Sequence, residues 1–222
     1  MNSLKNYIKE SLLNNINDLV DDDVFINILT YIKDNYSVAP QDPKLFKITK
    51  QNNIYIIDVD GSLRLDVNKS TITDGSFKFG HVTGYFDCSK TNISNLEGAP
   101  DIVDKFFDCG MCKNLESLEG GPSEVRGSFY SVSNCSKLTS LKGGPEKTIG
   151  DFNCMNCKNL ITLEGGPKYV GGNYQACNCS KLKNLSGVDT VKGYLDISRC
   201  KTLLSSRGSM IHVSKNINRI VS

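Results

Sequence analysis

A repeat of 21 to 23 residues limits the possible folds of this chain more than any other feature of its sequence. Four segments between Val82 and Pro167 share one pattern: "VTGYFDCSKTNISNLEGAP", "VDKFFDCGMCKNLESLEGGP", "VRGSFYSVSNCSKLTSLKGGP" and "TIGDFNCMNCKNLITLEGGP". An apolar or β-branched residue anchors each copy, and the anchors are Val59, Val82, Val103, Val125, Thr148, Val170 and Val191. Because each unit must bury its apolar side against the next unit, we predict a repeat solenoid.

Three further positions in each copy are predicted to face the interior. A large apolar residue stands four residues after the anchor: Leu63, Phe86, Phe107, Phe129, Phe152, Tyr174 and Leu195. A mostly small residue follows two positions later: Leu65, Cys88, Cys109, Ser131, Cys154, Ala176 and Ile197. About three residues further on comes an asparagine or cysteine: Asn68, Asn92, Cys112, Cys135, Cys157, Cys179 and Cys200. A spaced leucine pair and Gly-Gly-Pro then close the unit.

This order of strand apolars, then Asn or Cys, then leucines resembles the leucine-rich repeat, and "YLDISRCKTL" at 194–203 is similar to one such unit. The resemblance covers Val59 to Leu203. It implies an α/β-type repeat solenoid: a leucine-rich-repeat-like parallel β-sheet of about seven to eight coils, with one short strand per coil on the concave side. Phrases such as "LEGGPxxVxGxFxC" also resemble uncharacterised repeat proteins of large tailed bacteriophages.

The N-terminal region is predicted to be helical. Residues 3–20 place apolar residues on one helical face, and a second helix, capped by Asp22 or Asp23, is expected through about Tyr36. We therefore predict a helical cap over residues 1–44, with two helices and a Pro-containing linker. A solenoid with a C-terminal capping strand follows over 45–222, and Asn52-Asn53 forms a hairpin turn near its start. Alternatively, "SLKNYIKES" resembles the short targeting helices that direct some phage proteins into the prohead.

Composition does not favour a particular partner class. Hydrophobic residues make up 39% and charged residues 23% of the chain, which is enough to bury a core, and the net charge is +2. The sequence has no apolar run near 18 residues and no secretory signal pattern, so we expect no membrane association. The expected location is the cytoplasm: that of a host cell, or the virion if a phage encodes the protein.

The nine cysteines include CxxC pairs at 109/112 and 154/157, which are typical of zinc sites. These pairs lie two coils apart, and a strand spacing of ~4.8 Å separates them by roughly 10 Å. Thiolates that share one zinc cannot be so distant. We therefore predict no metal site and a ladder of buried thiols, with Cys177 outside the ladder as the most reactive thiol.

No catalytic residues and no cofactor are expected. The two histidines, His81 and His212, lie six coils apart, or ~29 Å at strand spacing, so no nucleophile–histidine pair can be argued. "DVDGS" at 58–62 opens like a calcium loop, but no acidic residue completes a loop and the segment fits the coil pattern. The repeated glycine pairs are predicted to form turns rather than phosphate cradles, because they recur in almost every coil.

The remaining candidate site is a surface. Residues three, five and seven positions after each anchor are expected to point outward from the concave sheet, and aromatic and acidic residues dominate these columns. The predicted partner-binding residues are Tyr85, Asp87, Phe106, Asp108, Tyr130, Asp151, Tyr194 and Asp196. Exposed aromatics of this kind can anchor an interface. The sequence therefore predicts a non-catalytic protein-interaction module whose partner it does not identify.

Two alternatives remain open. One is a virion or prohead-associated structural component of a tailed phage, with viral assembly partners. The other is an anionic-polymer binder that uses a column of five lysines: Lys113, Lys137, Lys158, Lys181 and Lys201. Nucleic acid is the polymer considered, but it is not favoured, because this column lacks the interleaved aromatics of single-strand binders.

Overall fold

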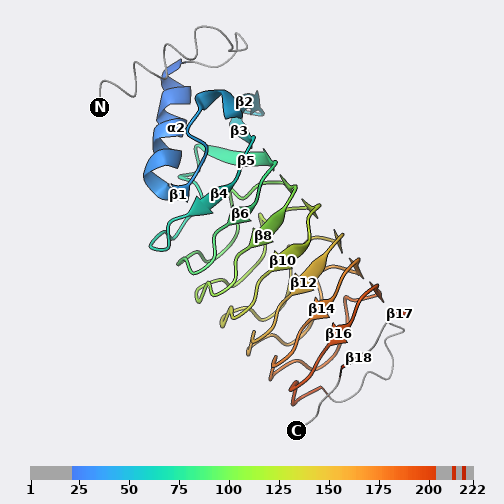
Figure 1. Ribbon diagram of the computed structural model, residues 1–222. Coiled ribbons are helices and arrows are strands. Elements are labelled where there is room, and N and C mark those ends of the chain that lie inside the picture. Colours follow the sequence, from blue (N-terminus) through green and yellow to red (C-terminus); the bar gives the residue numbers. More distant parts are fainter. Residues whose placement is uncertain (1–21, 204–211, 214–216, 219–222) are drawn as a thin grey trace.

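The computed structural model describes residues 22–203, 212–213 and 217–218, and in it the chain winds into a β-solenoid whose coils stack in sequence order (Figure 1). Two nine-stranded sheets line the stack. Sheet A contains β1 (Tyr36–Val38), β4 (Leu63–Leu65), β6 (Phe86–Asp87), β8 (Phe106–Asp108), β10 (Phe129–Ser131), β12 (Asp151–Asn153), β14 (Tyr174–Gln175), β16 (Leu195–Asp196) and β18 (Ile217–Asn218). Sheet B contains β2 (Phe46–Gln51), β3 (Ile54–Val59), β5 (Phe77–Val82), β7 (Ile102–Val103), β9 (Glu124–Val125), β11 (Lys147–Thr148), β13 (Tyr169–Val170), β15 (Thr190–Val191) and β17 (His212–Val213).

Each full coil contributes a strand to both sheets, whereas the leucine-rich-repeat resemblance implied one strand per coil. The valine or threonine anchors end the strands of sheet B, and the large apolar residues four or five positions later lie in sheet A. The pairings between coils are parallel, while β1–β4 and β2–β3 are antiparallel. The strands of sheet B from β7 onward are two residues long and show no alternation of apolar and polar residues that a sequence pattern could reveal.

Helix α2 (Asp22–Asn35) covers the first coils with its apolar face (Figure 1). Phe25, Ile28, Leu29 and Ile32 are buried and Val24 packs against the same core, as predicted. The helix predicted over residues 3–20 lies outside the described residues. The region predicted as a cap also supplies β1, which pairs with β4 and so belongs to sheet A.

The chain then passes through a short 3₁₀ helix, η1 (Pro43–Leu45), into the β2–β3 hairpin. The predicted hairpin turn is confirmed. Asn52 and Asn53 have φ values of 49° and 65°, the left-handed conformation that both central residues of a type I′ turn adopt. This hairpin starts sheet B, and β5 continues it in parallel.

Two kinds of corner close the coils. Between the sheets, a Cβ on Gly127 would overlap the carbonyl of Lys105, so glycine allows adjacent coils to approach closely here. After sheet A the chain turns through a residue in the left-handed conformation, with φ between 57° and 62° in six successive coils: Lys90, Met111, Asn134, Asn156, Asn178 and Arg199. Asparagine tolerates this conformation better than most residues.

The interior consists of columns of like residues. Aromatic rings follow one another from coil to coil: Phe86, Phe107, Tyr130, Phe152 and Tyr174, with neighbouring centroids 5.0 to 5.7 Å apart. Beside them, each buried ladder thiol donates a hydrogen bond to a carbonyl of the preceding coil, as Cys135 does to Cys109 at 3.3 Å and Cys157 to Val132 at 3.1 Å. Cysteine in this column is therefore a small apolar residue that also joins adjacent coils by hydrogen bonding.

The predicted register is wrong in one coil. Tyr130 is the buried aromatic residue that packs in the interior column, although Phe129 was predicted to fill this position; Tyr130 stands five positions after the anchor Val125, whereas the spacing in the other coils is four. Tyr130 pairs with Phe107 and Phe152 across the sheet. Val132 likewise takes the interior position that Ser131 was predicted to fill, although Ser131 is also buried.

Two coils earlier, Thr91 and not Asn92 occupies the ladder position. Thr91 is buried and its hydroxyl lies 3.4 Å from Cys112 Sγ, whereas Asn92 is exposed.

Candidate functional site

The predicted binding residues lie along sheet A, and the coil register determines which of them are neighbours. Phe106, Phe129 and Asp151 occupy equivalent positions in β8, β10 and β12. The carboxylates of Asp87 and Asp108 belong to paired residues of β6 and β8. Tyr194 and Asp196 lie four pairings further along the sheet than Asp108, at β16, which places them ~19 Å away at the usual strand spacing. The eight residues therefore do not form one compact site.

Four residues do form a compact group, which we call the aromatic cluster: Arg64, Tyr85, Asp87 and Phe106. The rings of Tyr85 and Phe106 stack with centroids 4.6 Å apart and planes 8° apart, and both side chains are half-buried. Arg64 lies 5.7 Å from the centre of the Tyr85 ring and binds Asp87 through an Nε–Oδ2 contact of 2.8 Å. The cluster is thus fixed by stacking, a cation–π contact and an ion pair.

Tyr130 was predicted to belong to the binding face, and this prediction is wrong. Its side chain is fully buried between Phe107 and Phe152. The error follows from the extra residue in its coil, and the sequence contained a signal for it. Cys135 stands ten residues after its anchor Val125, whereas Cys112 stands nine after Val103, so the insertion precedes the cysteine.

The aspartates on sheet A have a local structural role that the sequence did not indicate. Asp87, Asp108 and Asp196 each accept a hydrogen bond at Oδ1 from the amide two residues later, at 2.9, 2.7 and 3.0 Å. Asn153 makes the same bond at 2.9 Å in its own coil. These Asx turns lead into the left-handed corner after sheet A. One oxygen of each carboxylate is therefore engaged within the coil, and at Asp87 the second oxygen is also engaged, by Arg64.

Burial is the main cause of the raised pKa of Asp108, which the amide of Gly110 partly offsets. Asp151 has a different role. Its carboxylate receives the backbone amide of Asn173 at 2.7 Å and the side-chain amide at 3.3 Å, which links two coils. Asn173 in turn accepts the amide of Tyr194 at 2.9 Å. Tyr194 itself is 42% exposed and is the outermost of the predicted aromatic residues.

The five predicted lysines form two staggered columns rather than one. Lys113, Lys158 and Lys201 directly follow ladder cysteines, whereas Ser136 and Ser180 take that place in the intervening coils. Lys137 and Lys181 stand one position further on. Lys137 forms an ion pair with Glu116 at 3.1 Å. Each coil from Lys113 onward thus presents one lysine, alternately displaced by one residue.

The outer side of sheet B carries an ionic network that the sequence analysis also missed. His81 Nε2 lies 2.9 Å from Asp104 Oδ2, and Arg126 Nη1 lies 3.2 Å from Asp104 Oδ1. Partial burial alone would raise the pKa of Asp104, but His81 and Arg126 lower it below the usual range. His81 and His212 belong to strands six pairings apart in sheet B. The network contains an acid–base pair, His81 and Asp104, but no contact with a nucleophilic side chain is observed among the described residues.

Eight of the nine cysteines are buried, and Cys177 is the partly exposed one, as predicted. Burial, followed by the charge of Asp196, raises its pKa, so its position does not activate the thiol. Within residues 22–203, 212–213 and 217–218, no three His, Cys, Asp or Glu side chains are grouped to hold a metal ion.

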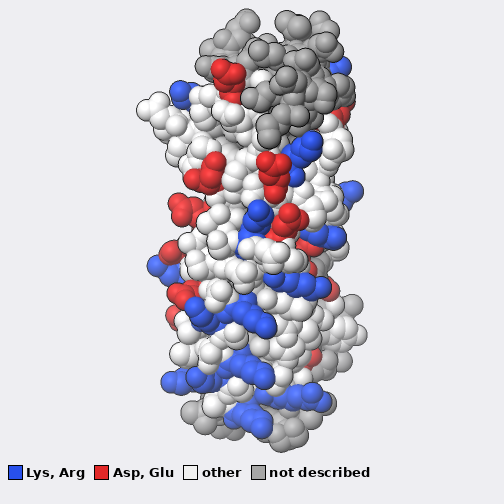
Figure 2. Space-filling view, turned by 90° about the vertical axis from the view of Figure 1, so that its left-hand side faces the viewer, with Lys and Arg blue, Asp and Glu red and all other residues white. Residues whose placement is uncertain are grey.

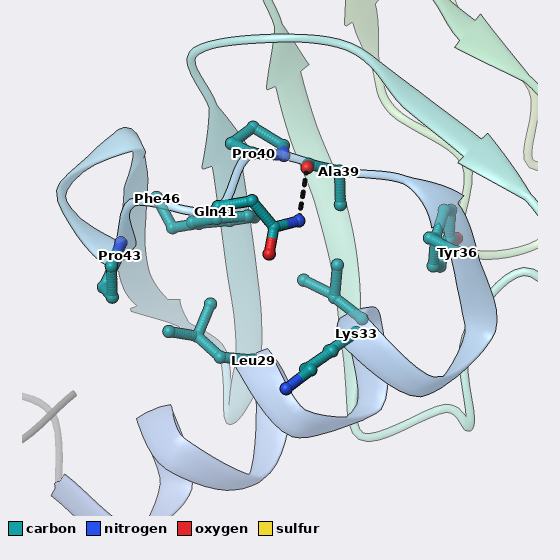
Figure 3. A pocket seen from close by; sticks show the side chains of 9 residues that line it. Leu29, Lys33, Tyr36, Ala39, Pro40, Gln41, Pro43 and Phe46 are labelled. Carbon is teal, nitrogen blue, oxygen red and sulfur yellow. Dashed lines mark hydrogen bonds between the residues drawn. The ribbon is translucent and has the colours of Figure 1, made fainter. Parts of the chain in front are cut away.

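One further hollow lies between α2 and the proline-containing linker (Figure 3). Leu29, Tyr36 and Phe46 line it, and Gln41 Nε2 donates to Ala39 O at 3.1 Å. The hollow is small and mainly apolar, and Lys33 is the charged residue that lines it.

No helix among the described residues has the length and apolarity needed to cross a bilayer. Comparisons of the chain with protein-family models, with curated proteins and with solved structures find no match.

Proposed function

We propose that this protein is a non-catalytic module that binds a protein partner through the aromatic cluster on sheet A. The observation that carries the proposal is the stacked, half-buried pair Tyr85 and Phe106 beside Arg64. Tyrosine and arginine are among the residues most enriched at the energetic centres of interfaces. Because the stack and the ion pair hold these side chains in place, binding would cost little side-chain entropy.

The chemistry of the cluster indicates what it would recognise. The rings offer an apolar surface, and the second carboxylate oxygens of Asp87 and Asp108 lie in the adjacent column. Arg64 compensates Asp87 through their ion pair, while Asp108 has no ion-pair partner in the described part of the chain. A partner would therefore present an apolar group against the rings and a basic group toward Asp108.

Quantitative affinity capture from the native host tests this proposal. Immobilised wild-type protein is compared with a Tyr85→Ala/Phe106→Ala variant and with a control, Ile149→Ala/Ile161→Ala, which removes exposed apolar side chains from other faces (54% and 39% exposed). We expect at least one protein to be retained by wild type and control but lost from the aromatic variant, with a cost of ~2 kcal/mol or more per ring. Equal retention by all three proteins would refute the proposal.

The finer class of the solenoid is part of this proposal. The leucine pairs, and the asparagine or cysteine before them, support a leucine-rich-repeat-like unit with about seven to eight coils, although the second sheet departs from that pattern. We place the protein in the cytoplasm, because buried thiols that donate hydrogen bonds suit a reducing compartment. The phage interpretation, in which the solenoid is a virion or prohead component, rests on sequence phrases alone, and detection in purified virions would test it.

A further inference from the structure

A shallow groove runs along the solenoid axis, beside the left-handed corner that follows sheet A. Equivalent positions of successive coils line it, from Lys90 to Asn178. Asn134, Asn156 and Asn178 follow one another along it, and Lys90, Lys113 and Lys158 flank them. The groove thus spans five coils, or ~19 Å at the usual strand spacing. We call it the basic groove.

Charge around the basic groove is not balanced locally. Lys113 and Lys158 are exposed and form no ion pair within the described part of the chain. The imbalance grows toward the C-terminal end. Residues 125–203 contain eleven lysines and arginines against five aspartates and glutamates, whereas residues 22–124 contain ten against sixteen. Figure 2 shows basic side chains gathered over the lower, C-terminal half of one face of the solenoid.

The polar groups of the groove are ordered by the coils. Asn178 Nδ2 donates to Asn156 Oδ1 at 2.7 Å, which links the side-chain amides of two adjacent coils. Ser136 Oγ donates to the carbonyl of Lys113 at 3.4 Å, and this leaves the lone pairs of its hydroxyl oxygen free. The groove therefore presents amides and hydroxyls in register, as well as ammonium groups.

In the column that directly follows the ladder residues, lysine recurs at twice the coil spacing, while Lys90 lies in the neighbouring corner column, in the first coil of the groove. Lys113 and Lys158 directly follow ladder cysteines two coils apart, roughly 10 Å, and Ser136 occupies the coil between them. A ligand that matches this spacing is a linear polymer whose monomers are each about as long as one coil is high. Every second monomer carries an anionic group, and the monomers between them carry neutral hydrogen-bonding groups. A polysaccharide of alternating acidic and neutral sugars has this pattern. Single-stranded nucleic acid carries a phosphate at every unit and is usually held by aromatic stacking, and no aromatic side chain lines this groove.

We propose that the basic groove binds a linear polysaccharide of alternating acidic and neutral sugars along the solenoid axis. The lysines would contact the carboxylates or sulfates, and the asparagines that line the groove would bind the hydroxyl and amide groups of the neutral sugars. This function is independent of the aromatic cluster, which lies on the face of sheet A.

Titration calorimetry at low salt tests the proposal on the full chain with a hyaluronan decasaccharide, whose uronate occurs at every second sugar. Wild type is compared with Lys113→Gln/Lys158→Gln and with the control Lys105→Gln/Lys192→Gln, which changes the net charge equally at exposed lysines outside the groove. We expect the groove variant to bind about tenfold more weakly, because it loses two exposed charge contacts, and the control to change less than about twofold. Asn156→Gly, which retains the left-handed backbone, should also weaken binding.

Thermal melts of all variants verify that they are folded. Absence of wild-type binding, or equal affinity of the groove and control variants, would overturn the proposal. A single-stranded oligothymidylate of equal charge serves as the competing polymer. Tighter binding of the oligothymidylate than of the decasaccharide would also overturn the proposal and would assign the groove to nucleic acid.

Discussion

The interior of the coils and the outer face of sheet A differ in how strongly neighbours constrain each position. Interior columns keep one kind of residue, aromatic or cysteine, over many coils because each side chain packs on its equivalent above and below. On the face, the column of Arg64 continues with Asp87, Asp108 and then Ser131. The constraints on these positions are local: a short turn bond at Asp87 and Asp108, and the ion pair between Arg64 and Asp87. The interior therefore determines the fold, and the face is where binding specificity can vary.

The largest expected contrast is between two aromatic residues on opposite sides of sheet A. Tyr130→Ala should lower the free energy of unfolding by ~3 to 5 kcal/mol, because it leaves a cavity between Phe107 and Phe152. Phe106→Ala, which truncates a half-buried ring on the face, should cost about 1 kcal/mol or less. Chemical denaturation of both variants measures the difference, and similar losses would contradict the register described above.

Two cysteines provide a smaller contrast of the same kind. Cys135→Ala removes a buried thiol and its hydrogen bond to Cys109 O, and we expect a loss of ~1 to 3 kcal/mol. Cys177→Ala, at the partly exposed thiol, should stay within about 0.5 kcal/mol of wild type. If the two variants melt alike, the ladder thiols do not join the coils as proposed.

A third contrast separates structural from binding roles on the face itself. Asp108→Ala removes the turn bond to the Gly110 amide and should cost ~1 kcal/mol. Asp108→Asn retains an acceptor, as Asn153 does in its own coil, so it should be close to neutral in stability. Both variants remove the negative charge of Asp108 and should weaken the binding of a basic partner equally. Full partner binding by Asp108→Asn would remove this carboxylate from the proposed contact surface.

The smallest effect concerns pH on the outer side of sheet B. The pKa of Asp104 is lower in the folded protein than in the unfolded chain, where it is about 3.8 to 4. The ionised carboxylate therefore stabilises the fold at pH values above the unfolded pKa, and this stabilisation is lost as pH falls through the folded pKa. The carboxylate is partly exposed, so the contribution is below ~1 kcal/mol. Asp104→Asn should therefore be slightly less stable than wild type at pH 6 and equal to it near pH 2. A difference that persists at pH 2 would point to a cause other than this charge.

The sequence was sufficient to predict the elements with strong local signals. The asparagine turn at 52–53, the apolar face of α2 and the repeat itself were confirmed because each depends on residues close in sequence. The second strand of each coil was missed, since two-residue strands have no periodicity. Tyr130 was misplaced because one inserted residue reverses which side chains face inward.

The candidate site was less predictable for a related reason. An aspartate that caps a turn and an aspartate that binds a partner look the same in sequence, and only the 2.7 Å bond to Gly110 identifies the structural role of Asp108. Contacts between coils, such as Arg64 with Asp87 or His81 with Asp104, depend on the register of segments 23 residues apart. The aromatic pair Tyr85 and Phe106 was identified correctly as neighbouring, because both residues keep the regular spacing from their anchors.

Thiol labelling of the native protein tests the separation of interior from face most directly. Burial raises the pKa of Cys157 to about 12, and the other ladder thiols are also enclosed, so an alkylating reagent should reach only Cys177 before unfolding. Intact-mass spectrometry should then show one label per chain, located at Cys177 by peptide mapping, and nine labels in denaturant. Rapid native labelling of Cys135 or Cys157, or protection of Cys177 while a ladder cysteine reacts, would contradict the coil register on which both binding surfaces depend.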